Sequence, residues 1–505
     1  AAASNGVGVY HIYGDETTHG EGYNMQAIPK PEQGLYGRMT AAMGESYVLH
    51  TPEAVRAAMR RGALRTRHPY KAGPFYLMLP INRQPARIAG FNPAALPGPY
   101  RPAPAMVADP AALAEAVSLL RRHHRIAIKA GGGARRAAAA VRRLAEAIGA
   151  VVVLSPGSTG VLPDAHPQNM HVGGSKGSIS GNYAMAEADL LMMVGSRAVC
   201  QADCSGIGFP QAEAVINLNG DLADAQHYNR TIALVGDIGA VAGQLLAAIE
   251  ALGGIPGEPK CAWLEACAAK KREWREFRAA RYAAEALDDP VWGGKALTQP
   301  AAIKTVADFA KRVGAIKYFD AGDVQANGFQ IVEDDAPFET FTESGASYMG
   351  FAPSALLASA LADKGHYGIA FCGDGSFMMN PQVLVDAVEH GTRGMVVVFD
   401  NRRMGAISSL QLSQYGADFR TSDSVGVDYC RLGEVIAGVK AFAGGATRVS
   451  LQSALEAAHA YRGLSLVHVP VYFGRDPLGG LGTYGAWNVG SWCEEVQARW
   501  LAQDL

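Results

Sequence analysis

The sequence has few charged residues for its length and no excess of either sign. Charged residues make up 18% of the 505 residues, and 45 Lys and Arg nearly balance 47 Asp and Glu. The formal net charge of −2 gives no basis for binding nucleic acid or a charged membrane, so neither is expected as a partner. No run of about 18 uncharged apolar residues occurs, which excludes a predicted transmembrane helix.

Cysteine is also scarce. The seven cysteines show none of the pair spacings typical of metal sites, and their odd number and scattered positions are typical of a reducing compartment. The first residues, AAASNGVGVYHIYG, lack the basic start and apolar core of a secretion signal. We therefore expect a cytoplasmic protein.

Strand and helix patterns alternate along most of the chain, which predicts an α/β fold. At about 150 residues per domain the length suggests three domains, each built as a doubly wound parallel sheet. Strands are predicted at 7–13, 75–80, 125–129, 151–154, 190–194, 214–218, 231–235, 316–320, 369–372, 395–399 and 465–471. Helices are predicted at 51–64, 110–122, 134–148, 299–312, 380–390, 428–438 and 452–461.

Changes in composition along the chain divide it into six segments. They are a partial α/β domain at 1–91, a proline-rich linker at 92–105, a second α/β domain at 106–252, a connector helix at 253–297, a third α/β domain at 298–480 and a tail at 481–505 that could serve as a lid. The connector is rich in Lys and Arg, and we expect these charges to mark a solvated helix face.

Residues 369–403 carry the clearest chemical pattern. Gly373-Asp374-Gly375 ends one apolar strand, and Asn401 ends the next. Because parallel strands joined by a helix have their carboxyl ends side by side, Asp374 and Asn401 should meet at one edge of the sheet. Their oxygens suit Mg²⁺ or Ca²⁺, and backbone amides after Gly375 can hold a phosphate. An ordinary glycine turn is the alternative interpretation.

A second glycine turn follows the predicted strand at 125–129. Gly131-Gly132-Gly133 suggests a dinucleotide site, but Arg136 occupies the last position of the G-x-G-x-x-G pattern, and a plain helix start is the alternative. FAD is therefore a candidate ligand that the incomplete pattern does not support.

The pattern at 373–401 resembles the diphosphate-binding motif of thiamine diphosphate enzymes, in which Gly-Asp-Gly is followed by Asn-Asn after a second strand. Together with Gly73-Pro74 before a strand, it is similar to the decarboxylase and acetolactate synthase family. The resemblance runs nearly end to end. It implies that the three α/β domains are a partial pyrimidine-binding domain, a central domain and a diphosphate-binding domain.

Within that family the sequence is similar to the cyclic-dione hydrolases, which include trihydroxycyclohexanedione hydrolase and cyclohexane-1,2-dione hydrolase. Four stretches carry this likeness: 347–351 (SYMGF), 373–379 (GDGSFMM), 399–401 (FDN) and the tail sequence AWNVGSWCEEVQ.

The resemblance implies thiamine diphosphate and Mg²⁺ as cofactors. Asp374, the Asn401 side chain and the Arg403 backbone carbonyl correspond to the metal ligands. Met349 corresponds to the bulky apolar residue that supports the V shape of the cofactor, with a plain core methionine as the alternative. The residues that correspond to cofactor contacts are Gly322, Asp323, Met349, Gly373, Gly375, Ser376 and Asn401.

The sequence departs from the family in three ways. Asp400 replaces the first Asn of the pair, and Arg403 stands where many members have Gly. The family's catalytic glutamate has no counterpart at the expected place, since Glu16 and Glu21 are better interpreted as solvated loop acids. We therefore expect that a separate small chain supplies the glutamate, that the sequence is a fragment, or that the activity is lost.

Hydrolysis needs a base that activates water. His11, His19 and His50 are the candidates in the first domain, with surface or structural histidines as the alternative. His166 and His171 in the central domain are less favoured.

The predicted function is thiamine diphosphate- and Mg²⁺-dependent C–C bond cleavage, with hydrolytic ring opening of a cyclic 1,2-dione as the reaction. An acetolactate synthase-like carboligase or decarboxylase of 2-oxo acids and a non-catalytic cofactor-binding subunit are the alternatives. The resemblance implies a small carbonyl substrate and a homo-oligomer, dimer or tetramer. A small subunit with the rest of the pyrimidine-binding domain is a further candidate partner.

Overall fold

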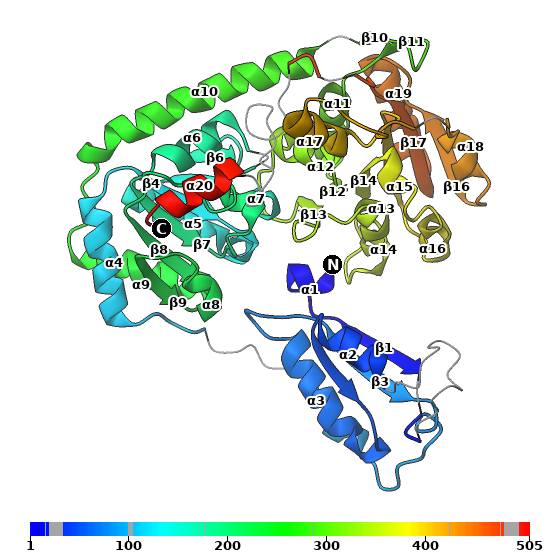
Figure 1. The fold of residues 1–505 in the computed structure, drawn as a ribbon, viewed down its shortest axis with the longest axis horizontal. Coiled ribbons are helices and arrows are strands. Elements are labelled where there is room, and N and C mark those ends of the chain that lie inside the picture. The colour runs from blue at the N-terminus through cyan, green and yellow to red at the C-terminus, as the bar shows by residue number, and fades with distance from the viewer. Residues whose placement is uncertain are drawn as a thin grey trace. The chain divides into compact units, whose positions relative to one another are not determined.

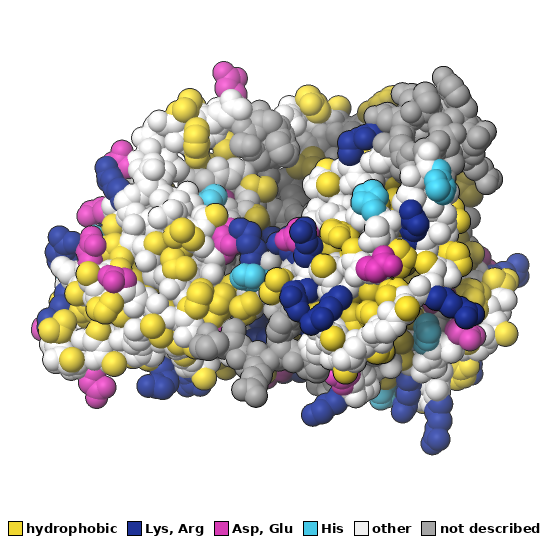
Figure 2. All heavy atoms as spheres, turned by 90° about the horizontal axis from the view of Figure 1, so that it is seen from below, with side chains coloured by type: hydrophobic (Ala, Val, Ile, Leu, Met, Phe, Trp, Pro, Cys, Tyr) yellow, Lys and Arg dark blue, Asp and Glu magenta, His cyan; other side chains and the backbone are white. Residues whose placement is uncertain are grey.

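The computed structural model describes residues 1–15, 17–19, 34–98, 105–175, 177–284, 286–423, 425–474, 476–478 and 494–505. They form two compact units, Ala1–Ala105 and Met106–Leu505, which are treated separately below (Figure 1). No described helix is long and apolar enough to cross a membrane. Side chains of both charge signs are interspersed with hydrophobic ones on the face that Figure 2 shows.

The first unit is built on a three-stranded parallel sheet with the order β1-β3-β2. Its elements are α1 (Ala2–Asn5), β1 (Tyr10–Asp15), α2 (Leu35–Ala41), β2 (Glu45–Val48), α3 (Val55–Thr66) and β3 (Phe75–Pro80). A small core joins the sheet to α3 through Ala58, Phe75 and Leu77. The first strand begins three residues later than the predicted start at residue 7.

The central part of the second unit contains a six-stranded parallel sheet with the order β6-β5-β4-β7-β8-β9. Its strands are β4 (Ile126–Ala130), β5 (Val151–Leu154), β6 (Asn169–Val172), β7 (Leu190–Val194), β8 (Ala214–Asn219) and β9 (Thr231–Val235). Its helices are α4 (Pro110–Arg122), α5 (Ala138–Ile148), α6 (Ile179–Glu187), α7 (Cys200–Asp203), α8 (Leu222–Ala225) and α9 (Ile238–Ala251). The helix predicted at 134–148 opens as a 3₁₀ turn, Gly132–Ala137.

A second six-stranded parallel sheet follows, with the order β13-β12-β14-β15-β17-β16. Its strands are β12 (Ile316–Phe319), β13 (Thr340–Thr342), β14 (Gly368–Gly373), β15 (Gly394–Asp400), β16 (Val439–Ala443) and β17 (Leu464–Pro470). Its helices are α11 (Gln299–Arg312), α12 (Asp323–Ile331), α13 (Phe351–Ala355), α14 (Ala358–Leu361), α15 (Asp374–Phe377), α16 (Val383–Glu389), α17 (Gly405–Tyr415), α18 (Tyr429–Glu434) and α19 (Arg448–Ala460).

Both faces of this last sheet are buried. Ile369 and Phe371 of β14 point into one core, with α11 and α19, while Ala370 and Cys372 point into the other, with α13 and α16. Continuous apolar strands covered on both sides are what parallel sheets require. The predicted α/β fold with doubly wound parallel sheets is therefore confirmed.

The connector between the two six-stranded sheets includes the short antiparallel pair β10 (Leu287–Asp289) and β11 (Gly294–Ala296), which the sequence did not predict. The described end of the tail, α20 (Glu494–Ala502), packs against the central sheet's domain, where Arg230 binds Asp504 at 2.7 Å. Most of the predicted lid lies outside the described residues, as do Glu16 and Glu21.

The long connector helix α10 (Cys261–Ala283) corrects the expectation of a solvated charged face. One stripe of the helix is buried and includes Lys271, Arg278 and Arg281 beside two tryptophans. Lys271 donates to the backbone carbonyl of Asp164 at 3.1 Å, and Arg278 lies 3.2 Å from the Asp164 carboxylate. These cations are buried because each faces fixed oxygen acceptors, which offset the loss of water.

Arg281 ties the helix to the last sheet's domain. It is 1% exposed and donates to Asn327 and Gln330 of α12 at 2.8 Å each, and to Asp476 at 2.9 Å. The connector helix α10 therefore supports α12 through the hydrogen bonds of Arg281.

Replacing Arg281 is expected to destabilise the second unit. Arg281→Met should lower the free energy of unfolding by about 3–5 kcal/mol, because it leaves the Asp476 carboxylate without its partner. Urea denaturation of the full chain followed by circular dichroism measures this. Arg272→Met on the exposed side of the same helix is the control and should change it by less than about 0.5 kcal/mol. Equal losses of unfolding free energy for the two variants would contradict this supporting role of Arg281.

Candidate functional site

The candidate site lies at the carboxyl edge of the last sheet, where β12 and β14 are neighbours and the strand order reverses. Ligands of open α/β sheets bind at such reversal points. Gly322 follows β12, Asp374 follows β14, and Asn401 follows β15. Because Gly373 pairs with Phe399 across β14 and β15, Asp374 and Asn401 emerge from adjacent strands. The structure thus brings together the residues that the sequence proposed for this edge.

Asp374 is the electrostatic centre of the site. Its side chain is 4% exposed, and its Oδ2 has no hydrogen-bond partner among the described residues. Burial raises its pKa to about 8, and the nearby carboxylate of Asp400, which is 1% exposed, contributes in the same direction. Two buried carboxyl groups side by side, one with a free oxygen, suit a divalent cation, which would offset their repulsion.

Such a cation would need amide and backbone oxygens as well. The described part of the chain holds no cluster of three or more His, Cys, Asp or Glu placed to bind a metal. The Asn401 side chain supplies an amide oxygen, which here accepts from the Arg403 amide at 3.1 Å. The mixed donor set that the sequence proposed is therefore the one this edge can offer.

The loop after Asn401 is held by Arg403. Its guanidinium donates to the Phe473 carbonyl at 3.0 Å and to Asp418 at 2.8 Å, while its own carbonyl accepts from the Gly405 amide at 3.0 Å. Arg402 has a φ of +55°, so the turn between Asn401 and Arg403 is left-handed. Arg403 anchors this loop by its side chain, which a glycine could not do.

Gly405 is a site residue that the sequence did not single out. A Cβ there would lie 1.9 Å from Asp323 Oδ2 and 3.1 Å from Asn401 Nδ2. Any side chain would separate the start of α12 from the end of β15. The need for glycine arises from two segments that are far apart in sequence, so no local pattern could reveal it.

Two turns at this edge carry the residues for which the sequence predicts contacts with a diphosphate. Gly322 has a φ of +75° and precedes the nine-residue helix α12, whose first residue is Asp323. Gly375 lies in the turn after β14, beside Gly373 and the buried Ser376. Met349 is half-buried and leans over Gly375, with its Cε 3.4 Å from where a Cβ of Gly375 would be.

Asp400 has a second partner that the sequence did not indicate. His468 on β17 lies with its Nε2 3.0 Å from Asp400 Oδ2. The two residues come from neighbouring strands that are separated by three helices and a strand in the chain. Asp400, which replaces an amide of the family pattern, is therefore held by an imidazole.

The three candidate base histidines lie in the first unit. His11 is within β1, with its ring 5.4 Å from that of Tyr76, while His19 and His50 follow the carboxyl ends of β1 and β2. All three are exposed. The structure does not gather them at one point, and their role as bases stays a prediction.

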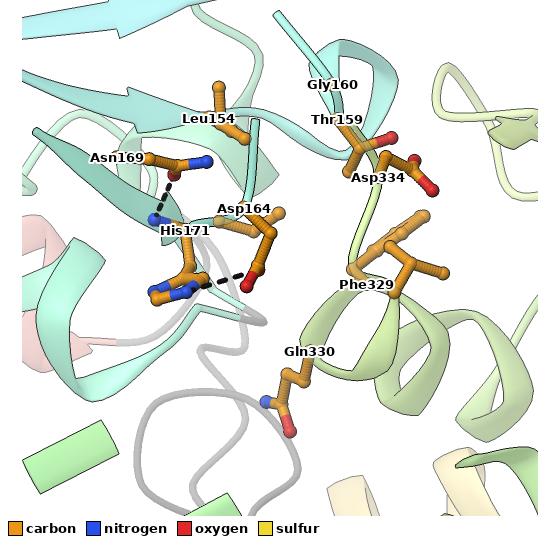
Figure 3. A pocket seen from close by; sticks show the side chains of 11 residues that line it. Leu154, Thr159, Gly160, Asp164, Asn169, His171, Phe329, Gln330 and Asp334 are labelled. Atoms are coloured by element: carbon orange, nitrogen blue, oxygen red, sulfur yellow. Dashed lines mark hydrogen bonds and ion pairs between the residues drawn. The ribbon is translucent and has the colours of Figure 1, made fainter. Parts of the chain in front are cut away.

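His171 lies in a closed region between the two six-stranded sheets (Figure 3). Its ring is 3.3 Å from Asp164 and 3.1 Å from Ser180, and burial lowers its pKa to about 4. The adjoining cavity is about 10 Å³, room for one water molecule. His171 therefore serves packing between the domains and not an open site.

The glycine turn at 131–133 is also closed. The amides of Gly131 and Gly133 donate to the carbonyls of Val194 and Gly195 at 2.9 and 3.0 Å. A Cβ at Gly131 would lie 2.3 Å from the Gly195 oxygen. Close packing of two loops explains these glycines, which leaves FAD without support from this turn.

Two family models match the second unit. Residues 113–245 match the family described as thiamine pyrophosphate enzyme, central domain. Residues 320–469 match the thiamine pyrophosphate enzyme, C-terminal TPP binding domain.

Among curated proteins, the chain is 26% identical over 381 residues to acetolactate synthase isozyme 1 large subunit of Escherichia coli, covering 75% of this chain and 64% of that protein. It is 25% identical over 389 residues to 3D-(3,5/4)-trihydroxycyclohexane-1,2-dione hydrolase of Lacticaseibacillus casei, covering 72% and 59%. A probable acetolactate synthase large subunit of Methanocaldococcus jannaschii is 27% identical over 329 residues, covering 64% and 53%. The chain spans less than two thirds of the length of each of these relatives.

The buried Asp374 predicts a pH dependence of stability. Its ordinary pKa is 3.8 and its folded pKa is about 8, so the native state holds a proton that the unfolded state releases between these values. The metal-free protein should therefore lose stability as the pH rises from about 4 to about 8. Asp374→Asn should flatten this loss. Thermal unfolding of both proteins without metal, at pH 5 and pH 9, measures it, and parallel pH dependences would contradict the assignment.

Proposed function

We propose that this chain, which belongs to the thiamine pyrophosphate enzymes, binds thiamine diphosphate with Mg²⁺ at the carboxyl edge of its last sheet and acts in the hydrolytic opening of a cyclic 1,2-dione. The observation that carries the proposal is the buried Asp374. One of its oxygens has no hydrogen-bond partner among the described residues, and its strand β14 pairs with β15, which ends at Asp400 and Asn401.

Each part of the site has a separate task in this proposal. Asp374, the Asn401 side chain and the Arg403 carbonyl hold the cation, and the turns at Gly322 and Gly375 receive the diphosphate. Met349 supports the apolar part of the cofactor from below. When bound, thiamine diphosphate supplies an electron sink for breaking a bond next to a carbonyl carbon. The chain's own contribution is to position the cofactor and to keep water away from its buried side.

The choice of substrate rests on the sequence motifs. Residues 347–351 and 373–379 resemble the ring-opening hydrolases, and one relative is named for hydrolysis of a trihydroxycyclohexane-1,2-dione. Other relatives are named acetolactate synthases and match a similar share of the chain, so carboligation of 2-oxo acids is the second candidate.

We also propose that a second copy of the chain covers the site. Apolar side chains that flank the site residues are exposed: Tyr348 49%, Met378 44%, Met379 58%, Met404 43% and Ile407 42%. A group of exposed apolar residues around a site is typical of an interface. The small subunit that would carry a catalytic glutamate stays a prediction of the resemblance.

Cofactor binding is the first test. Isothermal titration of the full chain with thiamine diphosphate and Mg²⁺ should show binding that Asp374→Ala weakens at least about tenfold, because the cation loses its carboxylate ligand. Asp386→Ala removes an exposed carboxylate of the same domain and should leave the affinity unchanged. Binding that survives Asp374→Ala undiminished would contradict the proposed metal site.

The reaction is tested by supplying both substrate classes to the purified chain with cofactor. Hydrolysis of cyclohexane-1,2-dione adds one water across the bond between the carbonyl carbons and yields one aldehyde and one carboxylic acid, 6-oxohexanoate. Proton release and NMR detect it. Pyruvate should be left intact. Release of CO₂ from pyruvate, with the dione untouched, would favour the carboligase instead.

A further inference from the structure

The segment that presents Met349 is residues 343–350, here called the Met349 loop, between β13 and α13. We infer that two buried carboxylates, Asp320 and Glu343, position this loop, so that it presents the apolar side chain of Met349 to the cofactor. The inference rests on the proposed function, because it assigns a task to the loop within the same site.

Glu343 holds the first limb of the loop. It is 2% exposed, and its Oε1 accepts from the amides of Gly345 and Ala346 at 2.9 and 3.0 Å. Its Oε2 accepts from the amides of Ala346 and Tyr348 at 3.0 Å each. One carboxylate therefore accepts from three amide groups within four residues, much as an anion does in a backbone nest.

Asp320 holds the second limb. It is fully buried at the end of β12, and its Oδ1 and Oδ2 accept from the amides of Gly350 and Ala352 at 3.0 and 2.9 Å. It also accepts from the Ala321 amide at 2.8 Å. The loop is thereby attached to the strand that carries the Gly322 turn.

Between the two limbs the backbone is strained. Ser347 has a φ of +53°, a left-handed conformation that is uncommon for serine, and its hydroxyl donates to Gln325 of α12 at 3.1 Å. A conformation of this kind persists only where surrounding bonds determine it. The carboxylate of Glu343 on one side and that of Asp320 on the other supply those bonds.

Met349 lies between these two anchors. The amide before it, of Tyr348, is bound to Glu343, and the amide after it, of Gly350, is bound to Asp320. Its side chain is therefore directed over Gly375 by two independent carboxylates. The same bonds occupy amides that could otherwise attract phosphate, so the diphosphate is left to the turns at Gly322 and Gly375.

The test compares two ligands of the full chain. Glu343→Gln is the main variant, because its carboxylate binds the loop amides of Gly345, Ala346 and Tyr348 and an amide nitrogen cannot accept from Tyr348. We expect at least tenfold weaker binding of thiamine diphosphate with Mg²⁺ but less than twofold change for magnesium pyrophosphate, which lacks the thiamine part. Asp334→Asn is the control, since it is a buried carboxylate bonded to Lys317 and Thr340 and not to the loop. It should change neither affinity.

Hydrogen exchange gives a readout without ligand. In Glu343→Gln the amides of residues 345–348 should exchange at least tenfold faster than in the wild type, and in Asp320→Asn those of 350–352 should do so. If Asp320→Asn does not fold, Glu343→Gln carries the test alone. Equal losses for both ligands, or unchanged exchange and binding in Glu343→Gln, would overturn the inference. A wild type that binds pyrophosphate but not thiamine diphosphate would overturn the proposed function with it.

Discussion

The site depends on the parallel pairing of β14 with β15. This register ends both strands at one level, so that Asp374 and Asp400 are brought together in a buried place where two like charges are unfavourable. This arrangement lies one strand away from the point between β12 and β14 where the strand order reverses. A bound divalent cation is the simplest means of offsetting it, and the imidazole of His468 on β17 lies 3.0 Å from Asp400 Oδ2. The neighbouring segments pack so closely around that point that a side chain at position 405 would collide with Asp323 and Asn401, which accounts for Gly405.

A second level of support lies behind the site. α12 begins at the Gly322 turn, and its far side is bonded to Arg281 of the connector helix. The same helix binds the loop at Asp164 of the central domain through Lys271 and Arg278. Residues that the sequence suggests are surface charges therefore join two domains and fix the helix that begins at the Gly322 turn. Buried charges also support the Met349 loop. There the carboxylates of Asp320 and Glu343 accept hydrogen bonds from backbone amides.

Much of the fold followed from the sequence, because central parallel strands are continuous apolar runs. The strands at 75–80, 151–154, 190–194 and 231–235 and the helices at 110–122 and 299–312 have the predicted bounds. Besides the short pair β10 and β11, the strands that were missed are β2, β6, β13 and β16, and all four lie at the edge of a sheet. Edge strands are short and partly polar, so they lack the pattern that identifies a buried strand. At the site, Asp374 and Asn401 were predictable because each ends an apolar run. Gly405, His468 and Asp320 were not, because each is defined by a partner distant in the chain.

The central claim is that Asp374 and Asn401 hold a divalent cation that anchors thiamine diphosphate. The most direct test is a crystal structure of the chain with thiamine diphosphate and Mn²⁺ in place of Mg²⁺, with the metal located by its anomalous scattering. The account predicts one Mn²⁺ bonded to an Asp374 oxygen and to the Asn401 amide oxygen, and in contact with the diphosphate. A diphosphate bound without metal at this edge, or Mn²⁺ bound elsewhere, would contradict it.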